Sequence, residues 1–145
     1  MIKILCVGKI KESYLRDFIA DYQKRIRKYH EITLIEVADV GSLEKERKLL
    51  EKYIMPRDYV ITLEIEGQML SSEALAKKID DTFIHYGTIT FIIGSSLGLD
   101  EEIKKRSNFA LSFSKLTFPH GVFRGILLEQ IYRAFKILHN ETYHK

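Results

Sequence analysis

Two glycines bracket the segment Gly94-Ser95-Ser96-Leu97-Gly98, which directly follows a wholly apolar run. Glycines in such a loop let the backbone approach a ligand closely, and the free N–H groups at a helix start favour polar or anionic atoms. No Gly-Lys-Ser/Thr of a phosphate-binding loop follows, and the G-x-G-x-x-G spacing of a dinucleotide site is absent. The segment therefore predicts either a tight turn or a loop that binds a ligand of another class.

Hydroxyls, aromatic rings and a lysine alternate in the segment that runs from Leu111 to Gly121. Alternation of this kind fits an edge strand that Pro119 ends. The segment is long for an edge strand, however, and Pro119 fixes the chain just before an expected helix. We favour a loop that wraps around a ligand.

The last residues, His139 to Lys145, form a short polar and aromatic tail. Chain ends usually fray, so a disordered tail and a tail that takes part in a site are both open. His120, His139 and His144 lie near this end, but no H-x-x-x-H or comparable pair appears, so no metal is expected. A Ser-His-Asp triad has no nucleophile-elbow motif to support it.

Strand and helix patterns alternate along the whole chain, which predicts an α/β fold with a mostly parallel sheet flanked by helices. No linker or internal repeat interrupts the alternation, so a single domain over residues 1–145 is expected. Gly67 is expected to close the third strand, and Pro56 to end the second helix. The expected strands are 2–7, 31–37, 58–65, 89–93 and 109–112, and the expected helices are 13–29, 43–55, 72–86, 100–106 and 121–138.

Ligands of open α/β sheets bind outside the carboxyl ends of the strands. Three such ends are candidates in the expected sheet: Leu63 after the third strand, Gly94 after the fourth, and residues 112–118 after the fifth. A binding site at this edge is therefore predicted from the residues alone.

The composition is that of an ordinary globular protein, with 46% hydrophobic and 30% charged residues. No apolar run approaches the roughly 18 residues of a membrane span, and the first residues make a poor signal peptide. The one cysteine, Cys6, lies in an apolar run and is expected to be a reduced core residue. A cytoplasmic location is expected.

Positive charge is concentrated towards the chain end. Residues 104–145 hold eight Lys/Arg against two Asp/Glu, although the net charge of the whole chain is only +3. Such a basic segment suggests a surface that faces a polyanion, whereas a solvated helix face is the simpler interpretation. Charge alone leaves both open.

Several strings then occur in a characteristic order over essentially the whole length. They are Val7-Gly8-Lys9, Leu63-Glu64-Ile65-Glu66-Gly67, residues 93–99, residues 111–120, residues 129–135 and Tyr143-His144-Lys145. Together they resemble the ribosomal RNA large subunit methyltransferase H family, a minimal member of the SPOUT methyltransferases.

The resemblance implies a homodimer that binds S-adenosylmethionine in a C-terminal trefoil knot. It implies methylation at N3 of pseudouridine 1915 in 23S rRNA, with the assembled ribosome as substrate. The matching cofactor-binding positions are Leu63, Gly94, Phe113, Ser114, Lys115, Leu116, Thr117 and Phe118. The matching catalytic positions at the target base are Arg124, Tyr143, His144 and Lys145.

Two positions depart from the family pattern. Ser95 stands where a second glycine is common, and Gly121 stands where a bulkier residue follows the Pro-His pair. The first affects how closely the backbone approaches the cofactor, and the second is expected to loosen the start of the last helix.

Chemically, a uracil N3 is a poor nucleophile until its proton leaves. Arg124 and Lys145 are expected to supply positive charge near the ring, and His144 to accept the proton. Candidate phosphate contacts are Lys24, Arg25, Arg27, Lys28, Arg133 and Lys136. Three alternatives remain: a non-enzymatic RNA-binding module, a methyltransferase of the same class with another RNA site, and a nucleotide hydrolase, which the missing phosphate-loop lysine disfavours.

Overall fold

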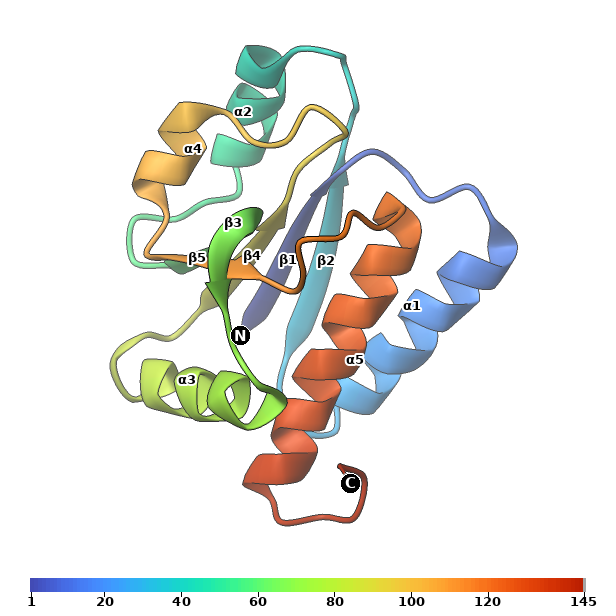
Figure 1. Cartoon of the computed structure of the whole chain (residues 1–145), viewed down its shortest axis with the longest axis vertical. Helices are drawn as coiled ribbons and strands as arrows, with labels where there is room; N and C mark the ends of the chain where they lie inside the picture. The colour runs from blue at the N-terminus through green and yellow to red at the C-terminus, as the bar shows by residue number, and fades with distance from the viewer. Residues whose placement is uncertain (145) are drawn as a thin grey trace.

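The computed structural model describes residues 1–144, and its strands and helices alternate throughout (Figure 1). The strands are β1 (Ile2–Val7), β2 (Ile32–Val37), β3 (Tyr59–Met69), β4 (Ile89–Ile93) and β5 (Phe109–Ser112). The helices are α1 (Ser13–Ile26), α2 (Leu43–Glu51), α3 (Ser72–His85), α4 (Glu101–Arg106) and α5 (His120–Leu138).

All five strands are parallel and form one sheet in the order β2-β1-β4-β3-β5. β1 and β4 are neighbours, yet the chain leaves β1 towards β2 and leaves β4 towards β5. This divergence makes the carboxyl end of β4 a switch point, where open α/β sheets bind ligands. The α/β class and the parallel sheet expected from the sequence are confirmed.

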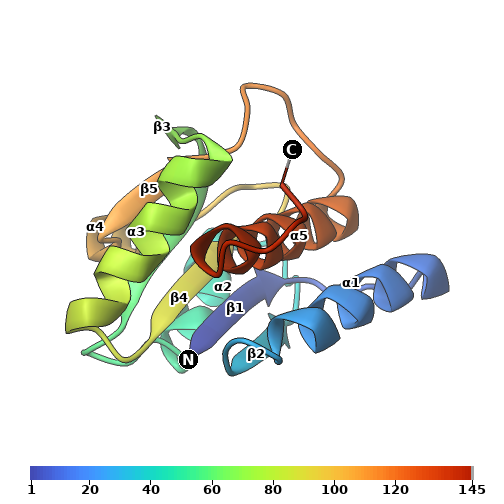
Figure 2. The same cartoon turned by 90° about the horizontal axis from the view of Figure 1, so that it is seen from below.

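The helices cover both faces of the sheet. α5 lies between α1 and α3 and contacts both of them, whereas α2 and α4 contact each other (Figure 2). The apolar face of α5 packs into the core under these helices, through Leu127, Leu128, Ile131, Ala134 and Phe135. These side chains therefore pack within the chain's own core.

Two glycines let α5 approach α1 closely. A Cβ at Gly121 would lie 2.7 Å from Leu15, and one at Gly125 would lie 2.1 Å from the ring of Phe18. Gly121 is buried and is a packing notch for the side chains of α1.

β3 is longer than the sequence indicated, because it continues through Gly67 to Met69. Its pairing with β5 shifts register between Leu63 and Gln68, so the residues between them leave the ladder. A Cβ on Gly67 would lie 2.7 Å from the carbonyl oxygen of Ala110. Gly67 is thus a site of close backbone approach within the strand and does not end it.

The first two helices end earlier than expected, at Ile26 and Glu51. The amide of Tyr29 bonds to the carbonyl of Ile26, and the amide of Tyr53 bonds to that of Leu50. Such i→i+3 bonds tighten a final turn and end the α-helical pattern.

Cys6 is buried in β1, as expected, and burial raises the pKa of its thiol to about 12. A thiol with so high a pKa is a poor nucleophile at neutral pH. Across residues 1–144, none of the helices has both the length and the hydropathy that crossing a bilayer requires.

Candidate active site

A cavity of about 640 Å³ opens at the carboxyl ends of β3, β4 and β5. Most of its walls come from three stretches: residues 63–66 of β3, the end of β4 with the loop after it (residues 93–96 and 98–99), and the end of β5 with the segment before α5 (residues 111, 113–114 and 116–118). Its volume falls in the range of pockets that enclose drug-sized ligands. The edge of the sheet that the sequence singled out therefore carries a cavity large enough for a nucleoside-sized ligand.

The loop after β4 is folded tightly against this cavity. The amide of Gly98 donates to the carbonyl of Ser95 at 2.9 Å, and Gly98 has a φ of +86°. A Cβ on Gly94 would lie 2.3 Å from the carbonyl oxygen of Gly98. Only glycine at position 94 allows this close turn, which exposes main chain to the cavity.

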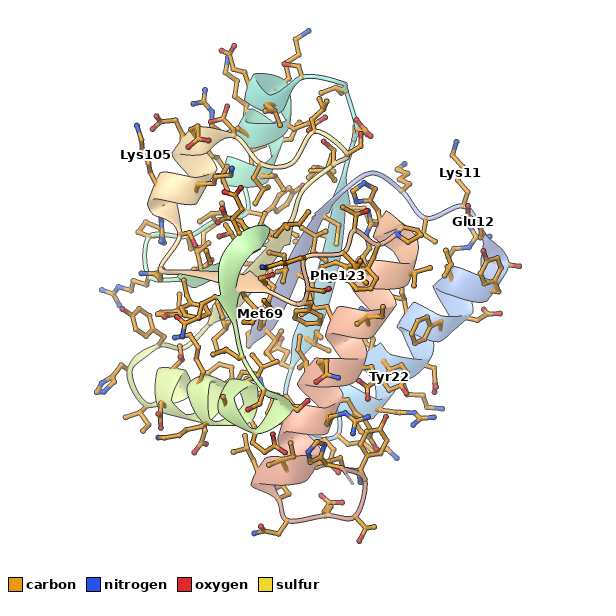
Figure 3. The ribbon with its side chains drawn as sticks, in the orientation of Figure 1. Lys11, Glu12, Tyr22, Met69, Lys105 and Phe123 are labelled. Carbon is orange, nitrogen blue, oxygen red and sulfur yellow. The ribbon has the colours of Figure 1, made fainter. Side chains whose placement is uncertain are left out.

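The segment before α5 closes the opposite wall with aromatic rings. Phe123 contacts Phe113 edge to face at 5.2 Å between ring centroids and stacks on Phe118 at 5.7 Å. Phe123 lies near the middle of the molecule, whereas Lys11 and Lys105 point outwards (Figure 3). Leu116 also lines the cavity, but 71% of its surface is exposed, so it forms the rim.

Most of the positions expected to bind the cofactor meet at this cavity. Its lining includes Leu63, Gly94, Phe113, Ser114, Leu116, Thr117 and Phe118. Lys115 is the exception among them, because it is exposed and does not line the cavity.

The described part of the tail is fixed at a different place along α5. Tyr143 donates from its hydroxyl to Glu129 at 3.1 Å and lies 3.2 Å from the hydroxyl of Tyr22. Glu129 also accepts from Arg133 Nε at 2.9 Å. Tyr22 projects from α1 beside α5 (Figure 3). Tyr143 is thus ordered by a polar network, contrary to the fraying that is usual at chain ends.

Burial, the hydrogen bond with Tyr22 and the charge of Glu129 all raise the pKa of Tyr143. The Tyr143 phenol is consequently neutral at physiological pH and acts as a hydrogen-bond donor, not as a base.

His144 is held between two charged side chains. Its Nδ1 lies 3.1 Å from Arg133 NH1, and its Nε2 contacts the carboxylate of Glu73 at the start of α3. A guanidinium only donates, so Nδ1 accepts from it and Nε2 carries the proton that Glu73 accepts. Both ring nitrogens are therefore engaged in this arrangement.

Arg124 lies apart from the tail. Only 1% of its side chain is exposed, and it donates to Glu36 at 2.7 Å and to the carbonyls of Val7 and Gly8 at 2.9 Å. The structure therefore does not bring Arg124 together with Tyr143 and His144, because two main-chain carbonyls and the partly buried carboxylate of Glu36 bind its guanidinium. Lys145, the remaining expected catalytic position, lies outside the described residues.

The sequence interpretation missed Glu129 as a functional candidate and considered Arg133 only as a phosphate contact. Their ion pair spans one helical turn, so the i,i+4 spacing was a readable signal. Their contact with Tyr143 and His144 was not readable, since it depends on how the tail folds back. No group of three or more His, Cys, Asp or Glu side chains able to hold a metal occurs within residues 1–144.

Residues 1–144 match a family model described as "Predicted SPOUT methyltransferase". A Leuconostoc citreum protein named ribosomal RNA large subunit methyltransferase H is 50% identical over 99% of each chain. A Bifidobacterium adolescentis protein of the same name is also 50% identical over 99% of each chain.

Among solved structures, a Haemophilus influenzae protein titled "a probable methylase family protein" matches with a TM-score of 0.61. The match covers 99% of this chain and 70% of that one, at 11% sequence identity. At this identity, the likeness concerns the fold alone.

Proposed function

Because this chain belongs to the SPOUT methyltransferases, within the ribosomal RNA large subunit methyltransferase H family, we propose that it methylates ribosomal RNA. The proposed reaction transfers a methyl group from S-adenosylmethionine to N3 of pseudouridine 1915 in 23S rRNA on the assembled ribosome. The main support is the cavity at the ends of β3, β4 and β5, whose walls include the Gly94 loop and the segment before α5.

The cavity fits a nucleoside-sized methyl donor in volume and in chemistry. Apolar and aromatic side chains such as Leu63 and Phe118 suit a purine ring, and the main chain exposed at Gly94 suits polar atoms. When bound, S-adenosylmethionine supplies an activated methyl group. The residues proposed to hold it are Leu63, Gly94, Phe113, Ser114, Leu116, Thr117 and Phe118. Lys115, which is exposed and does not line the cavity, is the remaining position that the resemblance implies.

The protein's own chemical task is to remove the N3 proton of the base. We propose that His144 accepts this proton at Nδ1, whose lone pair faces Arg133 in this structure. If Nδ1 were protonated, its N–H group would point at the N–H group of Arg133 and the two would repel, so Arg133 must move before His144 accepts the proton. The neutral hydroxyl of Tyr143 donates to Glu129 in this arrangement, so it must turn away from that carboxylate before it donates to a carbonyl oxygen of the base.

A homodimer solves a problem of distance in this proposal. Phe123 lines the cavity and Arg133 contacts the tail, and at 1.5 Å rise per residue they lie about 15 Å apart along α5. Methyl transfer needs the reacting atoms within roughly 3.5 Å. A second copy related by a two-fold axis can bring its tail to the cavity of the first.

The basic residues differ in how free they are to meet RNA. Arg133 pairs with Glu129, and Lys136 pairs with Glu141 at 2.9 Å, so both side chains already have an ion-pair partner within the chain. Lys24, Arg27 and Lys28 are exposed near the end of α1 and remain the better candidates for phosphate contacts. For Arg124 we propose a positioning role, and for Lys145 the positive charge near the base.

The test combines binding and methylation. We expect calorimetry to detect S-adenosylmethionine binding, and ribosomes lacking the modification to gain one methyl group at N3 when incubated with the protein. A protein that binds RNA but takes up no S-adenosylmethionine would instead be a non-enzymatic RNA-binding module. A methyl group mapped by mass spectrometry to another nucleotide would retain the reaction class and replace the site.

The role of His144 has its own test. In His144→Ala, the single-turnover rate should fall by roughly 100-fold, because a positioned base contributes about that much or more. S-adenosylmethionine affinity should remain unchanged, since His144 is not among the residues proposed to hold the donor. A full single-turnover rate in this variant would remove His144 from proton transfer.

A further inference from the structure

A buried acidic side chain lies behind the loop that forms one wall of the cavity. Glu46 belongs to α2, does not line the cavity and is only 2% exposed. Its Oε1 accepts a hydrogen bond from the Ser95 hydroxyl at 2.9 Å. Its other carboxyl oxygen, Oε2, is buried and has no hydrogen-bond partner among the described residues.

Ser95 connects this carboxyl group to the rest of the loop. The same hydroxyl accepts from the amide of Leu97 at 3.2 Å, and the carbonyl of Ser95 accepts from the amide of Gly98 at 2.9 Å. Ser95 itself is only 6% exposed. One bond from Glu46 therefore orients the hydroxyl around which residues 95–98 turn.

Stability of the fold does not account for this arrangement. A buried carboxyl oxygen without a partner lowers stability, because its desolvation is not repaid by a hydrogen bond. The neighbouring Leu50 anchors α2 through apolar packing and needs no polar contact. The polar contact of Glu46 is directed at the loop instead.

We propose that Glu46 is a positioning residue for the methyl-donor loop, acting through Ser95. The inference rests on the proposed function, in which this loop holds S-adenosylmethionine. α2 reaches the far end of the same loop as well, where Arg47 lies 3.8 Å from Asp100, the N-cap of α4. That contact is long and contributes little, so the bond from Glu46 carries the effect.

The experiment is a double-mutant cycle in the full-length protein, with S-adenosylmethionine affinity measured by calorimetry. Glu46→Ala and Ser95→Ala should each weaken binding by roughly tenfold, the effect of losing one hydrogen bond to a buried acidic group. The double variant should bind no more weakly than either single variant, because both changes remove the same contact.

Two further variants separate positioning from general stability. Glu46→Gln keeps an oxygen that can accept from Ser95, so its affinity should stay within about twofold of wild type. Leu50→Ala creates a cavity in α2 and should lower the melting temperature at least as much as Glu46→Ala. It leaves the Ser95 bond intact, so its affinity at a temperature where it is folded should match wild type.

Additive effects of the two alanine substitutions would overturn the inference, as would an equal loss of affinity in Leu50→Ala. A wild-type protein that does not bind S-adenosylmethionine at all would instead contradict the proposed function. The two failures are therefore distinguishable.

Discussion

Arg124 is the largest side chain that the core encloses completely, and it joins α5 to the ends of β1 and β2. Its acceptors are Glu36, Val7 and Gly8, which leaves its Nε without a partner among the described residues. A buried cation with these acceptors mainly holds the fold together. Its influence on the reaction passes through the position of α5.

Replacing Arg124 by Met should lower the free energy of unfolding by about 3–5 kcal/mol, because Glu36 and two carbonyls lose their donor. Urea unfolding measures this change. The matched control is Arg16→Met on the exposed face of α1, where a change of at most about 0.5 kcal/mol is expected. An Arg124→Met protein that keeps its stability and loses only its activity would instead support a direct role of Arg124 at the target base.

Asp58 provides a prediction on pH dependence. Burial acts to raise the pKa of Asp58, but hydrogen bonds from Lys3, Met55 and Thr90 outweigh it and hold the pKa below its usual value. The unfolded chain therefore takes up this proton at a higher pH than the folded protein does. Stability from this group is present above the ordinary carboxyl pKa and is lost as the pH falls below it.

We expect Asp58→Asn to flatten the loss of stability between about pH 5 and about pH 3, since the titrating group is gone. The measurement is the urea unfolding free energy across that range. Asp17→Asn, on the exposed face of α1, should keep the wild-type slope. Equal slopes for wild type and Asp58→Asn would contradict the assignment.

At the scale of elements, the loop after β4 is the piece of the site most sensitive to a single added carbon. A Cβ on Gly94 would lie 2.3 Å from the carbonyl oxygen of Gly98, whereas a Cβ on Gly87 would meet nothing within 4 Å. The two glycines flank the same strand, so they form a matched pair.

Gly94→Ala should therefore weaken S-adenosylmethionine binding by at least about tenfold, because the turn must open to make room for the alanine side chain. Gly87→Ala should leave the affinity unchanged. Calorimetry on both variants provides the comparison, and undiminished affinity in Gly94→Ala would separate this loop from the donor site.

At the scale of the whole molecule, cavity and tail occupy different stretches of α5, and the apolar face of that helix is already used in the core. Two exposed apolar side chains lie at the cavity instead. Ile65 and Leu116 line the mouth of the cavity and are 50% and 71% exposed. A homodimer that covers this mouth would explain both the exposure and the separation.

Mixing two impaired variants tests the homodimer. Gly94→Ala impairs the cavity and His144→Ala impairs the tail. If the tail of one copy serves the cavity of the other, mixed dimers should recover up to one intact site and methylate RNA faster than either variant alone at a donor concentration below saturation. Light scattering should give twice the monomer mass of 17.0 kDa. A monomer in solution, or mixed dimers no faster than either variant alone, would count against the shared site.

Local pattern alone determined most of the fold. Hydrophobic periodicity depends on near neighbours in the chain, so it predicted all five strands and placed Gly94 and residues 112–118 at one edge of a parallel sheet. The same reasoning located the cavity, because parallel strands present their carboxyl ends together.

The tertiary structure decided what distant residues do to one another. Arg124 finds Glu36 across 88 residues, and His144 finds Glu73 across 71. No local pattern carries such contacts, since they exist only once α5 has packed on the sheet and the tail has folded back. The extension of β3 past Gly67 has the same cause, because Gln68 and Met69 pair with Leu111 and Ser112 of β5, more than 40 residues away in the chain.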